Sequence, residues 1–527
     1  NWLRDYSQVI DTGSLKVFDA NTLVTLVGVL GYLQFGSSSG PFEVNSERLG
    51  VYLPVEHIDN PKNYADGQDA RSFDPRLRPP VDPGELLIDP KTGMKNYISN
   101  ENGGWDTSKA YIRRQLQASA MQGRAAKVGN SDKMKSEAYR LLGSALHPLE
   151  DFFAHSNFLE LALIHLGNDD VFPFVGNQTR IPSPAGKNVY PMVTGTFGSS
   201  DMVVSLLGGV SDYLSERSGP SLKTKVQQTT QKPGLRQKYG KQNIGKIQTI
   251  QGIVNRLTAQ AKHDAAASMS KPSKRQRRVL RGEMRKYDAM HLAVQRDLGV
   301  VTTILKAVGL DTDGDGDVDE VDLSKALSKV ITLKDEVKAK LVDGLGDVVE
   351  KVKNVKGVLE DLEDNLDVFV SQNLQKLLTP FITLVNKKIE QLTNMVIIGS
   401  DVQWEVFNTS TWTDPTHSLL SKDHFQSILN EPAGLIARMV TLNTVDKLVR
   451  VWENPTADVD ATIDEVLQCI FHPEFPQPGG SDIQGRVIGV VETWLNTMTP
   501  QDRAETLRRL TKDSISNLGN VRLLDGK

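Results

Sequence analysis

An acidic segment in the middle of the chain has the residue types and spacing of a calcium-binding loop. Calcium takes about six to eight oxygen ligands, and an EF-hand loop supplies them from positions 1, 3, 5, 7, 9 and 12, around a glycine at position 6. These ligand positions are occupied by Asp311, Asp313, Asp315, Asp317, Asp319 and Asp322, and position 6 is Gly316. Asp322 replaces the usual glutamate, which leaves magnesium possible. The pattern predicts an EF-hand-like structural calcium site, and a solvated acidic loop is the alternative.

A second constellation places two imidazoles and a carboxylate at intervals of four residues. On an α-helix, His147, Asp151 and His155 would lie along one face. This set suits Zn²⁺ or a similar divalent ion, and Asp151 and the nearby Glu160 are candidates for acid–base catalysis. Pro148 disfavours helix at His147, which predicts a kink there. A hydrogen-bonded cluster in an apolar core is the alternative interpretation.

Two further clusters of histidines and carboxylates lie far from this segment. One is His57 with Asp59 in a long early loop, and the other combines His417, Asp423 and His424. The three clusters together could assemble a site for about one to three ions of zinc or another divalent metal. A water bound to such an ion would be a nucleophile near neutral pH.

The elements that must position these side chains are predicted to be mainly helices. Residues 1–45, 109–167 and 425–527 have helical apolar patterns, whereas residues 46–108 and 171–200 are rich in proline, glycine and polar residues typical of loops. With 527 residues, the chain is too long for one hydrophobic core. Its single cysteine, Cys469, excludes an intramolecular disulfide. No apolar run is long enough for a conventional transmembrane helix.

Charge is distributed unevenly along the chain. Residues 221–286 contain 17 Lys and Arg against 2 acidic residues, whereas residues 311–370 contain 17 acidic against 8 basic residues. The basic segment could bind anionic lipid headgroups, or it could be a solvated, partly flexible loop. Nucleic acid is a weaker expectation, because Tyr239, and Tyr287 just after its end, are the only Phe, Tyr or Trp residues in or next to this segment.

An apolar seam with alternating steps of four and three runs from Leu341 to Phe369. It consists of Leu341, Leu345, Val348, Val352, Val355, Leu359, Leu362, Leu366 and Phe369. The seam predicts a long amphipathic helix, packed either on its own protein or on a second copy in a homo-oligomer. Gly344, Gly346 and Gly357 weaken this helix, because glycine costs about 1 kcal/mol in a helix interior.

Four stretches make the chain resemble the Het-C family, named for the fungal heterokaryon-incompatibility C protein. They lie within residues 1–7 (NWLRDYS), 146–157 (LHPLEDFFAHSN), 190–197 (YPMVTGTF) and 415–424 (PTHSLLSKDH). The resemblance implies cell-death or toxin activity directed at membranes, and a distant similarity to helical zinc-dependent phospholipases C and zinc nucleases. Those enzymes use a His-x3-Asp helix, which His147 and Asp151 match. The spacing from Asp151 to His155 departs from their pattern.

The resemblance and the charge pattern divide the chain into five segments. Residues 1–215 and 396–480 are predicted to form the two parts of a Het-C-type, phospholipase-C-like helical metal domain. Residues 216–290 are the basic segment, 291–395 combine the EF-hand-like loop with long amphipathic helices, and 481–527 are C-terminal helices. The predicted fold is therefore a mainly α, multi-subdomain helical protein.

Three functions are compatible with this sequence. The leading hypothesis is a cell-death protein or toxin, secreted or peripherally membrane-associated, that permeabilises lipid bilayers and binds calcium and zinc. The alternative is a metal-dependent, phospholipase C-like hydrolase of phosphodiester bonds. A nucleic-acid-binding protein or nuclease is the third. The expected partners are a lipid membrane and a second copy of the chain.

Overall fold

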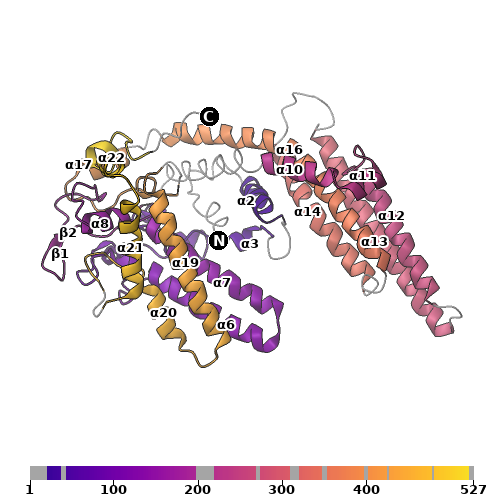
Figure 1. Ribbon diagram of the computed structural model, residues 1–527, viewed down its shortest axis with the longest axis horizontal. Helices are drawn as coiled ribbons and strands as arrows, with labels where there is room; N and C mark the ends of the chain where they lie inside the picture. The colour runs from indigo at the N-terminus through magenta and orange to yellow at the C-terminus, as the bar shows by residue number, and fades with distance from the viewer. Residues whose placement is uncertain are drawn as a thin grey trace. The chain divides into compact units, whose positions relative to one another are not determined.

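The computed structural model describes residues 20–36, 43–196, 219–268, 273–308, 320–346, 353–396, 401–423, 427–476 and 480–521. This described part is mainly α-helical, as predicted, and contains a single two-stranded sheet (Figure 1). The chain divides into two compact units. Unit 1 comprises Asn1–Ser14, Gly50–Gly208 and Leu392–Lys527, and unit 2 comprises Leu15–Leu49 and Gly209–Gln391. Most of unit 2 is therefore inserted in the sequence of unit 1. The finer division into five segments stays a prediction.

Unit 1 is built around a helical hairpin. α6 (Ser108–Gly129) packs along α7 (Asp132–Ala154), and α19 (Asn430–Glu453), from the other side of the insertion, packs on both (Figure 1). α20 (Val459–Leu467) covers α6 and α19, while α21 (Asp482–Asn496) contacts α19 and α8 (Phe158–His165). The hydroxyls of Thr107 and Ser131 cap α6 and α7 by accepting first-turn amides.

The apolar face of α7 explains its position in unit 1. Leu141, Ala145, Leu149 and Phe152 recur at steps of four and three and are buried. Phe152 packs edge-on against Phe153 in the centre of the largest buried cluster of unit 1. Burial of each of the large side chains Leu141, Leu149 and Phe152 contributes about 1.5–3 kcal/mol, so α7 is fixed firmly along its length.

Short elements and loops connect these helices. The elements before the insertion are α4 (Pro54–His57), η3 (Tyr64–Gly67), η4 (Ala70–Ser72), η5 (Pro83–Leu86), α5 (Asn96–Ser99), β1 (Ile181–Pro182) and β2 (Asn188–Val189). Those after it are α17 (Asp401–Asn408), α18 (His417–Leu420), α22 (Pro500–Arg509) and α23 (Lys512–Ile515). β1 and β2 pair antiparallel, with Ile181 opposite Val189 and Pro182 opposite Asn188. The long loops predicted before α6 and after α8 are therefore largely irregular.

Unit 2 is a bundle of longer helices. α12 (Ile247–Ala267) packs on α13 (Lys274–Ala307), α13 on α14 (Glu320–Leu345), and α14 on α2 (Ala20–Phe35). Unit 2 also contains α3 (Ser46–Leu49), α10 (Gly219–Thr230), α11 (Pro233–Tyr239) and α16 (Lys353–Val396), which continues beyond Gln391. Within the described residues, no helix has both the length and the apolar character needed to cross a membrane, as predicted.

The apolar seam from Leu341 to Phe369 is divided between two helices. Leu341 and Leu345 end α14, whereas the positions from Val355 to Phe369 belong to α16. Val348 and Val352 lie outside the described residues. The prediction of one uninterrupted helix is wrong at Gly346, which has a φ of +50°. Glycine adopts this left-handed conformation at little cost, so the helix ends there instead of continuing the seam.

Candidate metal centre

Seven of the residues singled out in the sequence meet within unit 1. They are His57, Asp59, His147, Asp151, His155, His417 and Asp423. They belong to α4 and the turn after it, to α7 and its C-cap, and to α18 and the segment that follows. His417 and Asp59 are 358 residues apart in the sequence, yet their side chains are hydrogen-bonded. The three clusters therefore come together in space.

One group of three possible ligands consists of His57, His147 and Asp151. The Nε2 atom of His147 lies 3.1 Å from Nδ1 of His57 and 3.3 Å from Oδ2 of Asp151. All three residues are buried. α7 runs through Pro148, so His147 and Asp151 remain one helical turn apart on the same face. Tyr52 stacks on the ring of His57, with 5.3 Å between the ring centroids.

The second group consists of His155, His417 and Asp423. His155 is the C-cap of α7, and its Nε2 atom lies 2.5 Å from Oδ2 of Asp423. The rings of His155 and His417 are 4.2 Å apart between centroids. Asp423 differs from the other possible ligands because 52% of its side chain is exposed. Asp151 approaches this group too, with Oδ1 at 4.0 Å from Nδ1 of His155, so its carboxylate lies next to both groups.

Asp59 contacts His417 and belongs to neither group of three. Its Oδ1 atom is 2.9 Å from Nδ1 of His417, and its Oδ2 atom accepts a hydrogen bond of 2.8 Å from the Tyr52 hydroxyl. With a proton assigned to Nδ1, Nε2 of His417 is the acceptor nitrogen, which is the form in which imidazole binds metals. A carboxylate that orients a ligating histidine in this way is a common feature of metal sites.

A strained residue separates His57 from Asp59. Ile58 ends α4 with a φ of 56° and a ψ of 22°, and its side chain is fully buried. A β-branched residue in this left-handed region costs about 1–3 kcal/mol, and such strain persists where the surrounding structure imposes it. The turn at Ile58 lets the side chains of His57 and Asp59 contact different histidines.

A segment from Pro191 to Thr196 links the three clusters through its backbone. The Asn60 N–H donates to the Gly195 carbonyl oxygen at 2.8 Å, and the His417 N–H donates to the Thr196 carbonyl oxygen at 2.8 Å. The buried Asn157 side chain donates to the Pro191 carbonyl oxygen and accepts from the Val193 N–H. The segment from Pro191 to Thr196 therefore contributes its hydrogen-bonding backbone to the architecture of the site.

Gly195 is the point of closest approach in this segment. A Cβ atom at this position would lie 2.3 Å from Cα of His417 and 2.6 Å from its backbone nitrogen. The obstructing atoms are backbone and cannot rotate away. Any larger residue would therefore displace α18 and with it His417.

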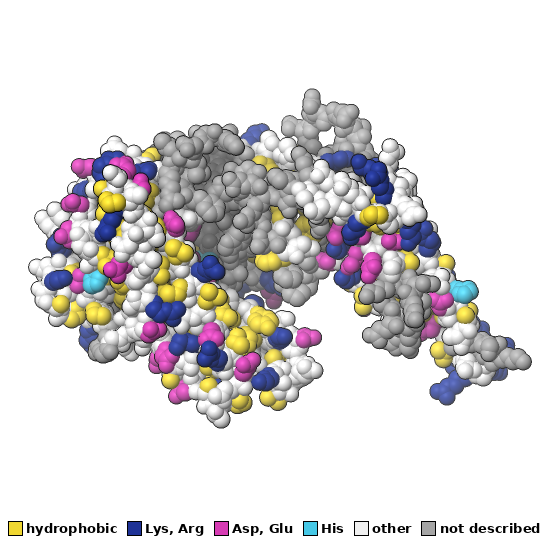
Figure 2. All heavy atoms as spheres, viewed as in Figure 1, with side chains coloured by type: hydrophobic (Ala, Val, Ile, Leu, Met, Phe, Trp, Pro, Cys, Tyr) yellow, Lys and Arg dark blue, Asp and Glu magenta, His cyan; other side chains and the backbone are white. Residues whose placement is uncertain are grey.

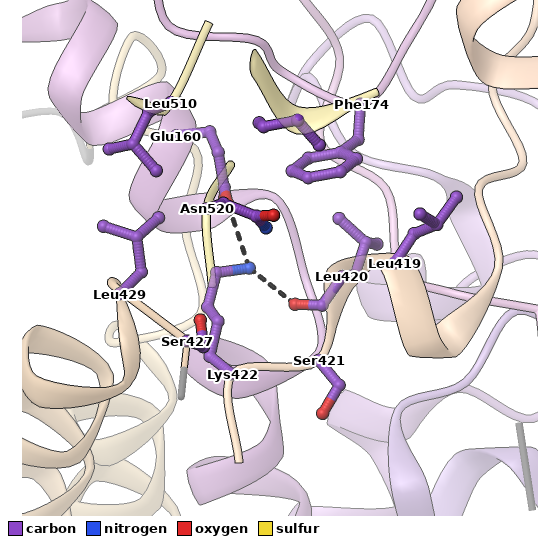
Figure 3. Close-up of a pocket in the computed structure, with 11 residues that line it drawn as sticks. Glu160, Phe174, Leu419, Leu420, Ser421, Lys422, Ser427, Leu429, Leu510 and Asn520 are labelled. Carbon is purple, nitrogen blue, oxygen red and sulfur yellow. Dashed lines mark hydrogen bonds and ion pairs between the residues drawn. The ribbon is translucent and has the colours of Figure 1, made fainter. Parts of the chain in front are cut away.

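Glu160, a sequence candidate for acid–base catalysis, belongs to neither group. Its Oε1 atom lies 3.1 Å from the ammonium of Lys422, and both side chains are almost completely buried. Figure 3 shows the Lys422 ammonium between Glu160 and the Leu420 carbonyl oxygen, to which it donates at 2.7 Å. Burial raises the pKa of Glu160, and the charge of Lys422 opposes that effect. Because Lys422 precedes Asp423, this pair fixes the backbone from which that ligand projects.

A second buried network joins the same regions of the chain. Asp414 accepts hydrogen bonds from Asn60 at 2.9 Å, Lys62 at 2.7 Å and Lys95 at 3.0 Å. Burial alone would raise the pKa of Asp414, but the two lysines outweigh it and hold the pKa below its usual value. Asp414 therefore stays ionised and ties the loop after Asp59 to the residues before His417. Asp414 did not stand out in the sequence, and Lys422 did so only as part of the stretch 415–424, because the partners of both residues are distant in the chain.

Two sets of predicted ligands cannot be placed. His424 lies outside the described residues, as do Asp311, Asp313, Asp315, Asp317 and Asp319 of the predicted calcium loop. Asp322 lies near the start of α14, with its carboxylate 3.6 Å from the ammonium of Lys325. The EF-hand-like loop, which would connect α13 to α14, stays a prediction.

Comparison with known proteins gave one match. A family model described as "Heterokaryon incompatibility protein Het-C" matches residues 1–523. No curated protein and no solved structure matched the chain. The family resemblance noted from the sequence is confirmed over nearly the whole chain, whereas the similarity to phospholipases C stays a prediction.

Proposed function

Because the chain belongs to the Het-C family, we propose that it is a cell-death protein of the heterokaryon-incompatibility type, which acts on lipid bilayers and holds zinc or a similar divalent metal in unit 1. The cell-death role is supported by the family match and the action on bilayers by the family resemblance. The metal site is supported by one observation above all, the convergence of four histidines and two aspartates into two adjacent groups of three.

The first group fits a zinc ion in its spacing. Zinc binds histidine nitrogen at about 2.0–2.1 Å in tetrahedral geometry, which separates neighbouring ligand atoms by about 3.3 Å. The separations at His147 are 3.1 Å to the nitrogen of His57 and 3.3 Å to the oxygen of Asp151. Burial of carboxylates next to imidazoles is costly unless cations compensate their charge, and a metal ion would supply that compensation.

The residues around the two groups would each have a distinct task. His57, His147 and Asp151 would hold one ion, and His155, His417 and Asp423 a second, with Asp151 adjacent to both. When bound, such ions polarise phosphoryl oxygens and lower the pKa of a coordinated water to about 7. Asp59 and Tyr52 would keep the ring of His417 in its ligating orientation. Lys422 and Glu160 would hold Asp423 in place.

The metal content of the full chain tests this proposal. We expect zinc-loaded, dialysed protein to retain at least one equivalent of zinc, measured by mass spectrometry of the elements. Asp151→Asn, which keeps the shape of the side chain, should lose most of that metal. Asp59→Asn should weaken binding about 10–100-fold, as expected for a residue that orients a ligand. His291→Ala in unit 2 is the control and should change nothing. Wild-type protein that retains no zinc after loading would refute the metal site.

A phosphodiester hydrolase is a second candidate function, and the exposure of Asp423 favours it. This carboxylate is half exposed in a group whose histidines are buried, so a substrate could reach the second group from solvent. The test compares dye release from liposomes with lipid products measured by mass spectrometry. Products that disappear in Asp151→Asn together with leakage would support a hydrolase. Leakage that persists in that variant without any product would refute it.

Calcium is proposed separately for the segment between α13 and α14. The support is the spacing of its six aspartates around Gly316. Titration calorimetry with calcium should show one site that is lost when Asp311 and Asp313 are both replaced by Asn. The Asp151→Asn variant should bind calcium normally, because it belongs to a different unit. A calcium affinity that falls with Asp151→Asn instead would assign the ion to unit 1.

A further inference from the structure

Unit 2 divides its basic residues into a paired set and an unpaired set. In the paired set, the ammonium of Lys232 lies 2.7 Å from Asp364, and Lys238 contacts Asp361. Both partners belong to α16, in the segment where acidic residues predominate. The basic and acidic segments of the sequence thus neutralise each other in part when the bundle forms.

The unpaired set lies at the start of α13. Lys274, Arg278, Arg281 and Arg285 are exposed, and none of them forms an ion pair with another described residue. Their steps of four, three and four place them along one face. At about 100° per residue, this face is opposite the one that carries the buried Tyr287, Met290 and Val294. We call these four residues the cationic stripe. Figure 2 shows dark blue side chains at the end of unit 2 where α12 ends and α13 begins.

The cationic stripe does not stabilise the helix that carries it. Positive charges at a helix N-terminus oppose the helix dipole, and like charges four residues apart repel each other. The first turn of α13 has no acidic residue to offset them, and its first buried residue is Tyr287. The capping box of Ser273 and Gln276 holds this end of the helix instead. The cationic stripe therefore contributes neither core burial nor a stabilising ion pair within the described residues, and its charges are available to a ligand outside the protein.

We propose that the cationic stripe docks unit 2 on an anionic phospholipid surface. This inference rests on the bilayer action proposed above and adds the contact that would bring the protein to the bilayer. A row of cations about 17 Å long on one helix face presents several charges at once to a layer of headgroups. Residues 262–286 contain no Phe, Tyr or Trp, so they lack the stacking surfaces that bind single-stranded nucleic acid.

The test uses two variants of the full chain that remove the same charge. Lys274→Gln with Arg278→Gln removes two members of the stripe, whereas Lys232→Gln with Lys238→Gln removes two paired lysines. Binding is measured by flotation with vesicles of phosphatidylcholine, with and without phosphatidylserine. We expect binding that requires phosphatidylserine, weakens with salt, and falls about 30-fold in the stripe variant. The paired-lysine variant should bind within about twofold of wild type.

Several results would overturn the docking role. They are an equal loss in both variants, binding that does not depend on phosphatidylserine, or tighter binding to duplex DNA that the stripe variant abolishes. Weaker binding caused by unfolding can be distinguished from a lost contact by the melting temperature of the stripe variant. That temperature should be unchanged or higher, because the removed cations oppose the helix dipole at the N-terminus of α13. Failure of this proposal is separate from failure of the metal site, because zinc content is measured on the same preparations. Asp151→Asn should still bind the vesicles.

Discussion

The two units treat charged side chains in opposite ways. Around its candidate metal centre, unit 1 buries carboxylates, lysines and histidines that come from positions hundreds of residues apart, as in the contact of Asp59 with His417. Unit 2 keeps its ion pairs near the surface of packed helices, as between Lys338 and Glu363. Removing one partner of a buried ion pair lowers the stability of the fold strongly, whereas an exposed ion pair contributes little to stability. We infer that unit 1 is chemically specialised and intolerant of substitution, and that unit 2 tolerates changes in charge.

The largest effect is expected from Lys422→Met in unit 1. The substitution leaves Glu160 buried without its cation and should cost about 3–5 kcal/mol of stability. Hydrogen exchange followed by mass spectrometry should show faster exchange in α8 and in the 417–423 segment. The double variant with Glu160→Met should recover much of this loss, since two apolar groups replace the pair. No recovery would mean that Lys422 acts independently of Glu160.

A pH titration should produce the next largest effect, also in unit 1. Burial lowers the pKa of His472 to about 4, a shift that its neighbour His165 reinforces and the Tyr190 carbonyl and Glu474 oppose. The neutral ring donates to the Tyr190 carbonyl oxygen and accepts the Glu474 N–H. Because the folded pKa lies below the unfolded value near 6.5, this stability is complete above pH 6.5 and is lost as the pH falls toward 4.

Protonation of His472 should lower the free energy of unfolding by about 3 kcal/mol between pH 7 and pH 4, measured from unfolding curves. His472→Gln is expected to be less stable at pH 7 but to depend less on pH. The exposed His263 of unit 2 provides the comparison, and His263→Gln should leave the pH dependence unchanged. An unaltered slope in His472→Gln would show that other groups govern acid sensitivity.

Replacing one glycine by alanine should destabilise unit 1 but stabilise unit 2. Gly195→Ala places a methyl group against the His417 backbone and should destabilise unit 1 by about 1–3 kcal/mol, with weaker zinc binding. Gly357→Ala meets no atom within 4 Å in α16 and should stabilise unit 2 by up to about 1 kcal/mol. Thermal unfolding measures the change in melting temperature of each variant. Changes of the same sign and size would mean that the two units respond alike to these substitutions.

The smallest effect is expected from an ion pair of unit 2. Lys338→Met removes the partner of Glu363, and both side chains are largely exposed. Solvent screens such pairs, so the change in unfolding free energy should be below about 1 kcal/mol. Urea denaturation at low and high salt measures it. A loss as large as that of Lys422→Met would show that unit 2 depends on its charges as strongly as unit 1.

Helices and clusters with local patterns could be predicted from the sequence. The mainly α fold and the helical face that carries His147 and Asp151 follow from apolar spacing in α7. The histidine clusters stood out because histidine is scarce in this chain, with nine residues in total. The seam from Leu341 to Phe369 failed at Gly346, where the backbone preference of glycine outweighed the apolar pattern.

The structural roles of the supporting residues could not be read from the sequence, although Lys422, Asn157 and Gly195 lie in stretches that resemble the Het-C family. Lys422, Asp414 and Asn157 act through partners that are distant in sequence or are backbone atoms. A buried lysine is indistinguishable from a surface lysine until its neighbours are known. Gly195 is explained by one close approach to His417, which depends on how the two parts of unit 1 dock. These features are properties of the tertiary structure, so local spacing cannot reveal them.

The insertion of unit 2 within unit 1 has a consequence for the newly made chain. His155 and Asp423 are 268 residues apart, with unit 2 between them. At about 5–20 residues per second, a ribosome that has finished the first half of the site needs roughly 15–50 seconds to supply the second. During that interval the nascent protein carries His57, His147 and Asp151 of the first group and His155 of the second, but lacks His417 and Asp423. The second group of possible ligands therefore cannot form until the ribosome has passed Asp423, whereas the first group can form before unit 2 is made.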